Sequence, residues 1–158
     1  MYTRILVPID GSPTSNRGLA EAIRLAKDQK AMLRLLHVID ESFLMFGAGY
    51  GVDVINSLRE SGNRLVDEAR TRAREEGVEA EGTVVETLSR RVADKILEDA
   101  RAWRSDLIVM GTHGLRGFLH LAVGSDAEAV LHGAACPVLL IRAIEPAQAS
   151  VAGSTRAA

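Results

Sequence analysis

The chain has 158 residues and a mass of 17.0 kDa, which predicts one domain large enough to bury a core without disulfide or metal staples. Hydrophobic residues make up 47% and charged residues 25%, a balance that excludes wholesale disorder. The net charge of -2 gives no electrostatic reason to expect nucleic acid or an anionic membrane as a partner. A lone cysteine, Cys136, excludes an internal disulfide. No signal-peptide pattern and no apolar stretch of membrane length is visible, so we expect a cytoplasmic protein without a membrane anchor.

Short β-branched runs alternate with amphipathic stretches from the start of the chain. Residues Ile5–Ile9 predict a buried strand with Pro8 near its end, because proline cannot donate to a β-ladder. A turn at Asp10 and Gly11 follows, with Ser12 as the N-cap of a helix and Pro13 at its first position. That helix carries an apolar stripe formed by Leu19, Ala22, Ile23 and Ala26.

The rest of the chain continues the alternation of strands and helices. Strands are expected at Met32–Val38, Gly82–Glu86, Asp106–Met110 and Val138–Ile141, with helices around 55–69, around 92–100 and after Gly124. This order predicts right-handed βαβ crossovers and an α/β fold, a parallel sheet with helices on both faces. The apolar first, fourth and fifth strands suggest burial on both sides. We expect the domain to span residues 1–143, with 144–158 as a disordered tail.

Unusual chemistry follows two of the predicted strands. In parallel sheets of this kind, ligands sit beyond the carboxyl ends of the strands, where the strand order reverses. Asp10 and Gly11 come after the first strand, and a Gly-Thr-His-Gly segment, Gly111–Gly114, follows the fourth. Asp10 has two interpretations, a residue that only shapes the entry to the helix or a ligand contact.

The segment from Gly111 to Ser125 carries the clearest motif, with the spacing G-x2-G-x9-G-[ST]. Glycines allow close backbone approach, and free N–H groups in such a loop can cradle phosphate oxygens. Gly124 and Ser125 open the next helix, whose N-terminus favours an anion. The Ser125 hydroxyl would add a donor or face a bound Mg²⁺. The alternative is a flexible loop whose glycines only serve tight turns.

Over Arg4 to Arg142 the chain resembles the universal stress protein family. The resemblance rests on the glycine motif and on four further segments, Ile5–Ser12, Leu36–Asp40, Asp106–Gly111 and Ala135–Leu140. It implies a single-domain, five-stranded parallel sheet of order 3-2-1-4-5, a Rossmann-like fold of the adenine nucleotide alpha hydrolase type. The glycine motif implies the ATP-binding branch of the family. Mg²⁺ would then be held mainly by the phosphates, with Ser125 as a possible ligand.

The resemblance also implies roles for individual residues. Asp10 would lie beside the ribose or adenine, Val38 would offer backbone contact to the base, and Met110 would line the adenine pocket. A homodimer would form through the last strand, Val138, Leu139, Leu140 and Ile141. The full set of expected nucleotide-binding residues is Pro8, Ile9, Asp10, Val38, Met110, Gly111, His113, Gly114, Arg116, Gly117, Gly124, Ser125 and Asp126.

Asp126 departs from the small or β-branched residue that the family often has after Gly-Ser. A carboxylate in the first turn of a helix is favoured by the helix dipole, so its role can be structural. It would also repel a triphosphate unless Mg²⁺ bridges the two. Both interpretations stay open.

No catalytic residues are predicted. The chain has no P-loop lysine, no obvious general base and no signature of a nucleotidyl-transfer enzyme. Together with these observations, the resemblance implies a nucleotide-dependent stress-response regulator with at most slow ATP hydrolysis. The alternative is a nucleotide-free protein-interaction module of the same fold. The apolar run Phe43–Phe46 has two open interpretations, a contact for a ligand or an unknown protein partner and a partly buried loop.

Overall fold

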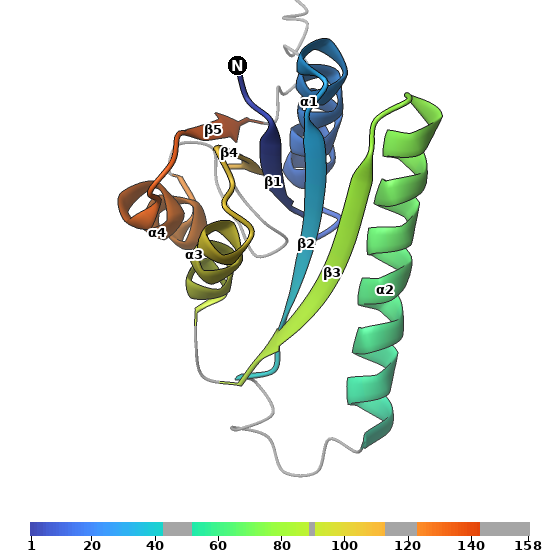
Figure 1. Cartoon of the computed structure of the whole chain (residues 1–158). Coiled ribbons are helices and arrows are strands. Elements are labelled where there is room, and N and C mark those ends of the chain that lie inside the picture. The colour runs from blue at the N-terminus through green and yellow to red at the C-terminus, as the bar shows by residue number, and fades with distance from the viewer. Residues whose placement is uncertain (43–51, 89–90, 113–122, 143–158) are drawn as a thin grey trace, which may run out of the picture.

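The computed structural model of the chain describes residues 1–42, 52–88, 91–112 and 123–142. Strands and helices alternate along it, as the sequence predicts (Figure 1). In chain order the elements are β1 (Arg4–Pro8), α1 (Pro13–Gln29), β2 (Met32–Asp40), α2 (Val52–Glu75), β3 (Ala80–Thr87), α3 (Val92–Ala102), β4 (Leu107–Gly111), α4 (Ser125–Gly133) and β5 (Val138–Ile141).

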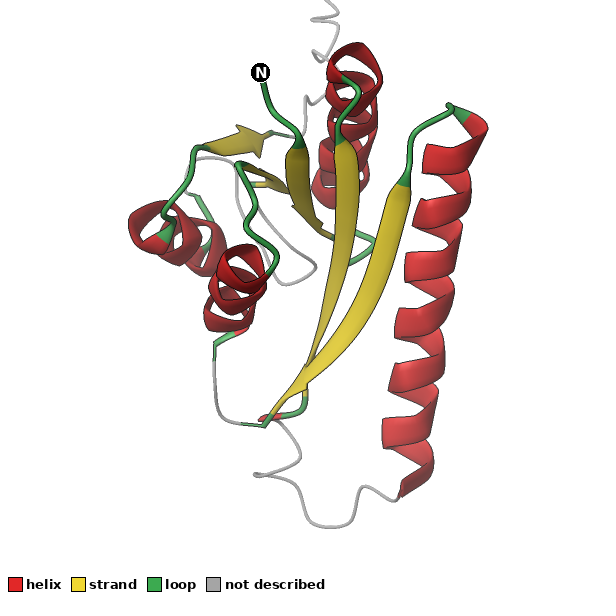
Figure 2. Ribbon diagram, viewed as in Figure 1, coloured by secondary structure: helices red, strands yellow, loops and turns green. Residues whose placement is uncertain are grey.

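The strands form one parallel sheet of five with the order β3-β2-β1-β4-β5, which confirms the predicted fold class and strand order. Helices α1 and α2 cover one face of the sheet and α3 and α4 cover the other (Figure 2). Chain order therefore reverses at β1, which pairs with β2 on one side and with β4 on the other. This reversal places the carboxyl ends of β1 and β4 side by side.

The side chains of alternate strand residues belong to two separate hydrophobic cores, one on each face of the sheet. Val7 and Leu35 face α1 and α2, whereas Leu6, Leu36 and Ile108 face α3 and α4. All of these side chains are fully buried. Burying one such side chain contributes about 1.5–3 kcal/mol, so the two cores hold the strand ends rigidly in place.

The connection from β1 to α1 forms as its sequence predicts. Pro8 is the last residue of β1, and Gly11 adopts a φ of +80°, which favours glycine. Ser12 is the N-cap of α1, and its Oγ accepts a hydrogen bond from the Ser15 amide at 3.2 Å. Pro13 occupies the first helical position, where its missing N–H costs nothing. The turn is thus fixed at the edge of the sheet where the site lies.

The fifth strand differs from its expected burial. Residues of β4 are buried throughout, but all four residues of β5 are only half-buried. The reason is position, because β5 is an edge strand with β4 as its neighbour in the sheet. An apolar run therefore signalled a strand correctly but overstated how far the helices cover it.

Two expectations concern the chain as a whole. The proposed domain end near residue 143 and the tail 144–158 lie outside the described residues. Within the described part of the chain, no helix combines the length and the apolar character needed to cross a bilayer.

Candidate functional site

A cavity of about 640 Å³ opens over the carboxyl ends of β1, β2 and β4. It lies where the strand order reverses, the position at which open parallel sheets bind ligands. The cavity extends over the carboxyl ends of the strands to both faces of the sheet. One part of it therefore faces α3 and α4, and another part faces α2. Of the expected site residues, it brings together Pro8, Ile9, Asp10, Val38, Met110, Gly111, Gly124, Ser125 and Asp126.

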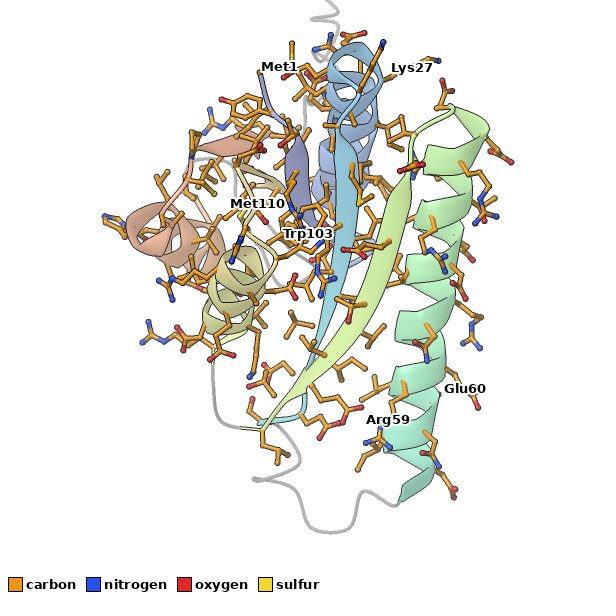
Figure 3. All side chains as sticks on the ribbon, in the orientation of Figure 1. Met1, Lys27, Arg59, Glu60, Trp103 and Met110 are labelled. Carbon is orange, nitrogen blue, oxygen red and sulfur yellow. The ribbon has the colours of Figure 1, made fainter. Side chains whose placement is uncertain are left out.

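The part that faces α3 and α4 has an apolar wall. Val38 and Met110 approach it from the sheet, and Val92 and Ile96 approach it from α3. Met110 is only 7% exposed and lies on the side of the sheet that α3 and α4 cover (Figure 3). Such a wall can accept a flat aromatic ring, because ligand pockets are mostly apolar with few polar groups.

The two ends of the glycine motif meet at this wall. The amide of Gly124 donates to the carbonyl oxygen of Thr112 at 2.8 Å, and the Thr112 amide donates to Ile141 at 2.9 Å. Gly124 is the N-cap of α4 and has no side chain to satisfy the first-turn amides. The helix therefore presents N–H groups and the positive end of its dipole at the rim of the cavity.

Asp10 is held by backbone and side-chain hydrogen bonds of the β1–α1 turn. Its Oδ1 accepts from the Ser12 amide at 2.9 Å, and its own amide donates to the Ser15 Oγ at 3.1 Å. The half-buried side chain lines the cavity beside the end of β1. Asp10 thus shapes the entry to the helix and also lines the cavity, so its position is compatible with both sequence interpretations.

Asp126 connects the starts of two helices. Its Oδ1 accepts a long hydrogen bond, 3.4 Å, from the Ala93 amide in the first turn of α3. Its half-buried side chain also lines the cavity, next to Gly124 and Ser125. The contact gives Asp126 a structural role without removing it from the site.

Residues of α2 line a further part of the cavity, and none of them is among the expected site residues. His37 lines it, and the His37 Nδ1–H donates to the carbonyl oxygen of Ile9 at 2.8 Å. His37 is not among the binding residues expected from the sequence. Its position before Val38 at the end of a strand was a signal that it lies near the site. Further lining residues not anticipated are Ser15, Ile39, Asp40, Leu58, Ser61, Gly62, Leu65, Thr112 and Ala127.

Four expected nucleotide-binding residues, His113, Gly114, Arg116 and Gly117, lie outside the described residues, as does the run Phe43–Phe46. Among the residues that are described, no cluster of three or more His, Cys, Asp or Glu side chains could hold a metal ion.

The sequence model of the universal stress protein family matches residues 1–142. The chain belongs to the universal stress protein family. Universal stress protein YxiE of Bacillus subtilis is 32% identical over 151 residues, which cover 90% of this chain and all of YxiE. A universal stress protein from Burkholderia pseudomallei of known structure is 36% identical, with a TM-score of 0.75, and the match covers 90% of this chain and 97% of that one.

Some solved universal stress proteins hold nucleotides. One was determined in complex with cAMP and shares 23% identity with this chain, with a TM-score of 0.68 over 89% of this chain and 97% of that one. Another, from Archaeoglobus fulgidus, was determined in complex with dAMP and shares 24% identity, with a TM-score of 0.64 over 89% of this chain and 98% of that one. At these identities the likeness establishes the shared fold.

Proposed function

We propose that this universal stress protein binds an adenine nucleotide in the cavity over β1 and β4 and acts as a nucleotide-dependent regulator in the stress response. ATP with Mg²⁺ is the expected ligand, as for the ATP-binding branch of the family. One observation carries the proposal: Thr112 and Gly124, which bracket the glycine loop, are hydrogen-bonded to each other beside the start of α4, at the rim of a cavity that Asp10 also lines.

Each part of a nucleotide has a matching part of the site. The apolar wall of Val38, Met110 and Val92 suits the base, and the Asp10 carboxylate suits the ribose hydroxyl groups as a hydrogen-bond acceptor. The first-turn amides of α4 and the exposed Ser125 suit the phosphates. Structures of universal stress proteins in complex with cAMP and dAMP support a nucleotide as the ligand class.

We assign no catalytic residue and propose at most slow ATP hydrolysis. Oriented phosphates and Mg²⁺ supply part of what hydrolysis needs, but a water must also be activated. Asp10 and Asp40 each accept a hydrogen bond from a backbone amide two residues ahead, so these carboxylates are oriented by the turns they stabilise. The chain therefore suits a role as a sensor whose state follows the bound nucleotide.

We further propose a cytoplasmic homodimer formed through β5, without nucleic acid or membrane as a partner. Val138–Ile141 is a half-buried edge strand, and Leu131 on the neighbouring helix α4 is 50% exposed. An edge strand with apolar flanks is a ready surface for strand pairing. A protein partner that responds to the nucleotide state would complete the regulatory role.

The test begins with denaturation of the purified protein and mass spectrometry of any released small molecule. Calorimetric titrations with ATP, ADP, AMP and cAMP then compare wild type with Gly114→Ala, whose added Cβ should block the close backbone approach of a phosphate. Gly133→Ala, a glycine outside the cavity lining, is the matched control. We expect a captured or titratable adenine nucleotide and a selective loss in Gly114→Ala. A correctly folded wild type that binds none of the four would instead favour a nucleotide-free interaction module.

A further inference from the structure

The described lining of the cavity has a one-sided charge. It includes three carboxylates, Asp10, Asp40 and Asp126, whereas neither lysine nor arginine occurs among its described residues. Backbone amides and a helix dipole supply only partial positive charge. An anionic ligand at the start of α4 therefore meets the carboxylate of Asp126 beside amides that carry only partial positive charge.

The three carboxylates lie at different places around the cavity. Asp10 and Asp40 follow or end strands β1 and β2, and each accepts a backbone amide at 2.9 Å within its own turn. Asp126 lies in the first turn of α4, beside the glycine that closes the motif, and its contact with Ala93 is longer, 3.4 Å. It is thus the carboxylate nearest in sequence to the amides that we expect to hold phosphates.

Asp126 also lies where two helices begin. The N-caps of α3 and α4 are Arg91 and Gly124, and neither makes a side-chain capping bond. The Asp126 carboxylate therefore adds negative charge near both helix N-termini, beside Asp94 in the first turn of α3 and Glu128 in that of α4. A phosphate that approaches the start of α4 must share this environment with a charge that is already present.

We propose that Asp126 makes the site discriminate between nucleotides by the charge of their phosphates, so that metal-free ATP binds poorly relative to AMP and Mg²⁺ relieves the difference. The inference rests on the proposed function, because it assumes that a nucleotide binds here. Metal-free ATP carries about two more negative charges than AMP near neutral pH, and repulsion grows with each of them. A divalent cation held by the phosphates offsets those extra charges, whereas AMP has little need of one.

The test uses a variant that removes the charge of the Asp126 side chain and keeps its shape. Asp126→Asn retains a side-chain oxygen that can accept from the Ala93 amide, so the link between α3 and α4 is preserved. Glu128→Gln is the matched control, because Glu128 lies in the same first turn but is exposed and does not line the cavity. Dissociation constants are measured for AMP, for ATP in EDTA and for ATP with excess Mg²⁺, at two salt concentrations, beside the melting temperature of each variant.

We expect Asp126→Asn to raise the affinity for metal-free ATP about five- to tenfold and the affinity for AMP by less than about threefold. The affinity for Mg-ATP should rise no more than that for AMP. The increase for metal-free ATP should become smaller at high salt. Glu128→Gln should leave the ratio of ATP to AMP affinity unchanged. An unchanged ratio in Asp126→Asn would overturn the inference and leave the proposed function intact. A loss of Mg-ATP affinity would overturn it too, since Asp126 would then be a ligand of the metal. If wild type and both variants bind no nucleotide while melting cooperatively, the proposed function itself fails.

Discussion

Gly111 packs so closely against Thr14 that a Cβ on Gly111 would lie 2.9 Å from the carbonyl carbon of Thr14. Gly111 is the last residue of β4, and Thr14 lies in the first turn of α1. A second glycine, Gly18, repeats the contact one turn later, where a Cβ would lie 3.4 Å from the Gly111 amide nitrogen. Helix α1 therefore approaches the end of β4 closely, and the glycine that opens the G-x2-G-x9-G-[ST] motif also helps to set this helix–sheet distance.

The close approach predicts that Gly111→Ala destabilises the protein. The new methyl group meets backbone and Cβ atoms that cannot move without shifting α1, so we expect a loss of about 1–3 kcal/mol in the free energy of unfolding. Gly133→Ala is the control, because the nearest atom there is the tip of a flexible side chain, Leu97 Cδ1. Urea unfolding measures both, and a Gly111→Ala protein as stable as Gly133→Ala would show that α1 can retreat freely.

Much of this arrangement follows from sequence patterns that act locally. Ser12 and Pro13 predict the start of α1, and the alternation of strands and helices predicts a parallel sheet with covered faces. Contacts made only in three dimensions escape such reasoning. The hydrogen bond between Asp126 and Ala93 joins residues 33 apart, and no spacing rule relates them. His37 is a second example, because α2 passes beside it at Gly62. The sequence predicts the helix α2, but it does not show that Gly62 faces His37.

The contact between His37 and Gly62 predicts strong energetic coupling. A Cβ on Gly62 would lie 2.7 Å from the His37 Cδ2, and the ring is anchored to the carbonyl oxygen of Ile9. Gly62→Ala should therefore cost about 1–2 kcal/mol in the wild type through overpacking. In a His37→Ala background the nearest remaining atom is Val84 Cγ1, 3.3 Å from such a Cβ, so the same change should cost less than in the wild type, because alanine is the better helix former by about 1 kcal/mol. The free energies of unfolding of the wild type, the two single variants and the double variant form a double-mutant cycle. Additive changes in these free energies would contradict the coupling.

The hydrogen bonds of Asp106 predict how the stability of the protein depends on pH. Its carboxylate accepts from the Thr3 amide and Thr3 Oγ1, both at 2.7 Å, and from the Arg4 amide at 3.0 Å. Burial alone would raise the pKa of Asp106, but these hydrogen bonds outweigh it and lower the pKa below its ordinary value. The stabilisation is therefore complete above the unfolded-state pKa, about 3.9, and is lost as the pH falls through the lower folded-state pKa.

Asp106→Asn should accordingly lower stability at neutral pH and flatten its decline below about pH 4. Urea midpoints measured from neutral to acidic pH would show this, with Glu68→Gln on the exposed face of α2 as a control for removing one carboxyl group. If Asp106→Asn and Glu68→Gln have the same pH profile, the hydrogen bonds to Thr3 do not favour the ionised form.

The outer edge of β5 predicts how the proposed homodimer can be broken. The carbonyl groups of Pro137 and Ile141 accept from Ile108 and Thr112, so the odd-numbered residues bond to β4. Because successive residues of a strand point their hydrogen-bonding groups to opposite sides, the amide of Leu140 faces away from β4. Leu140→Pro removes that outward donor, and Leu140→Ala removes the same side chain but keeps the donor. If β5 pairs with a second copy, sedimentation should show a dimer for wild type and Leu140→Ala and a monomer for Leu140→Pro. A Leu140→Pro protein that stays dimeric would place the interface elsewhere, and circular dichroism of both variants verifies that the sheet has formed.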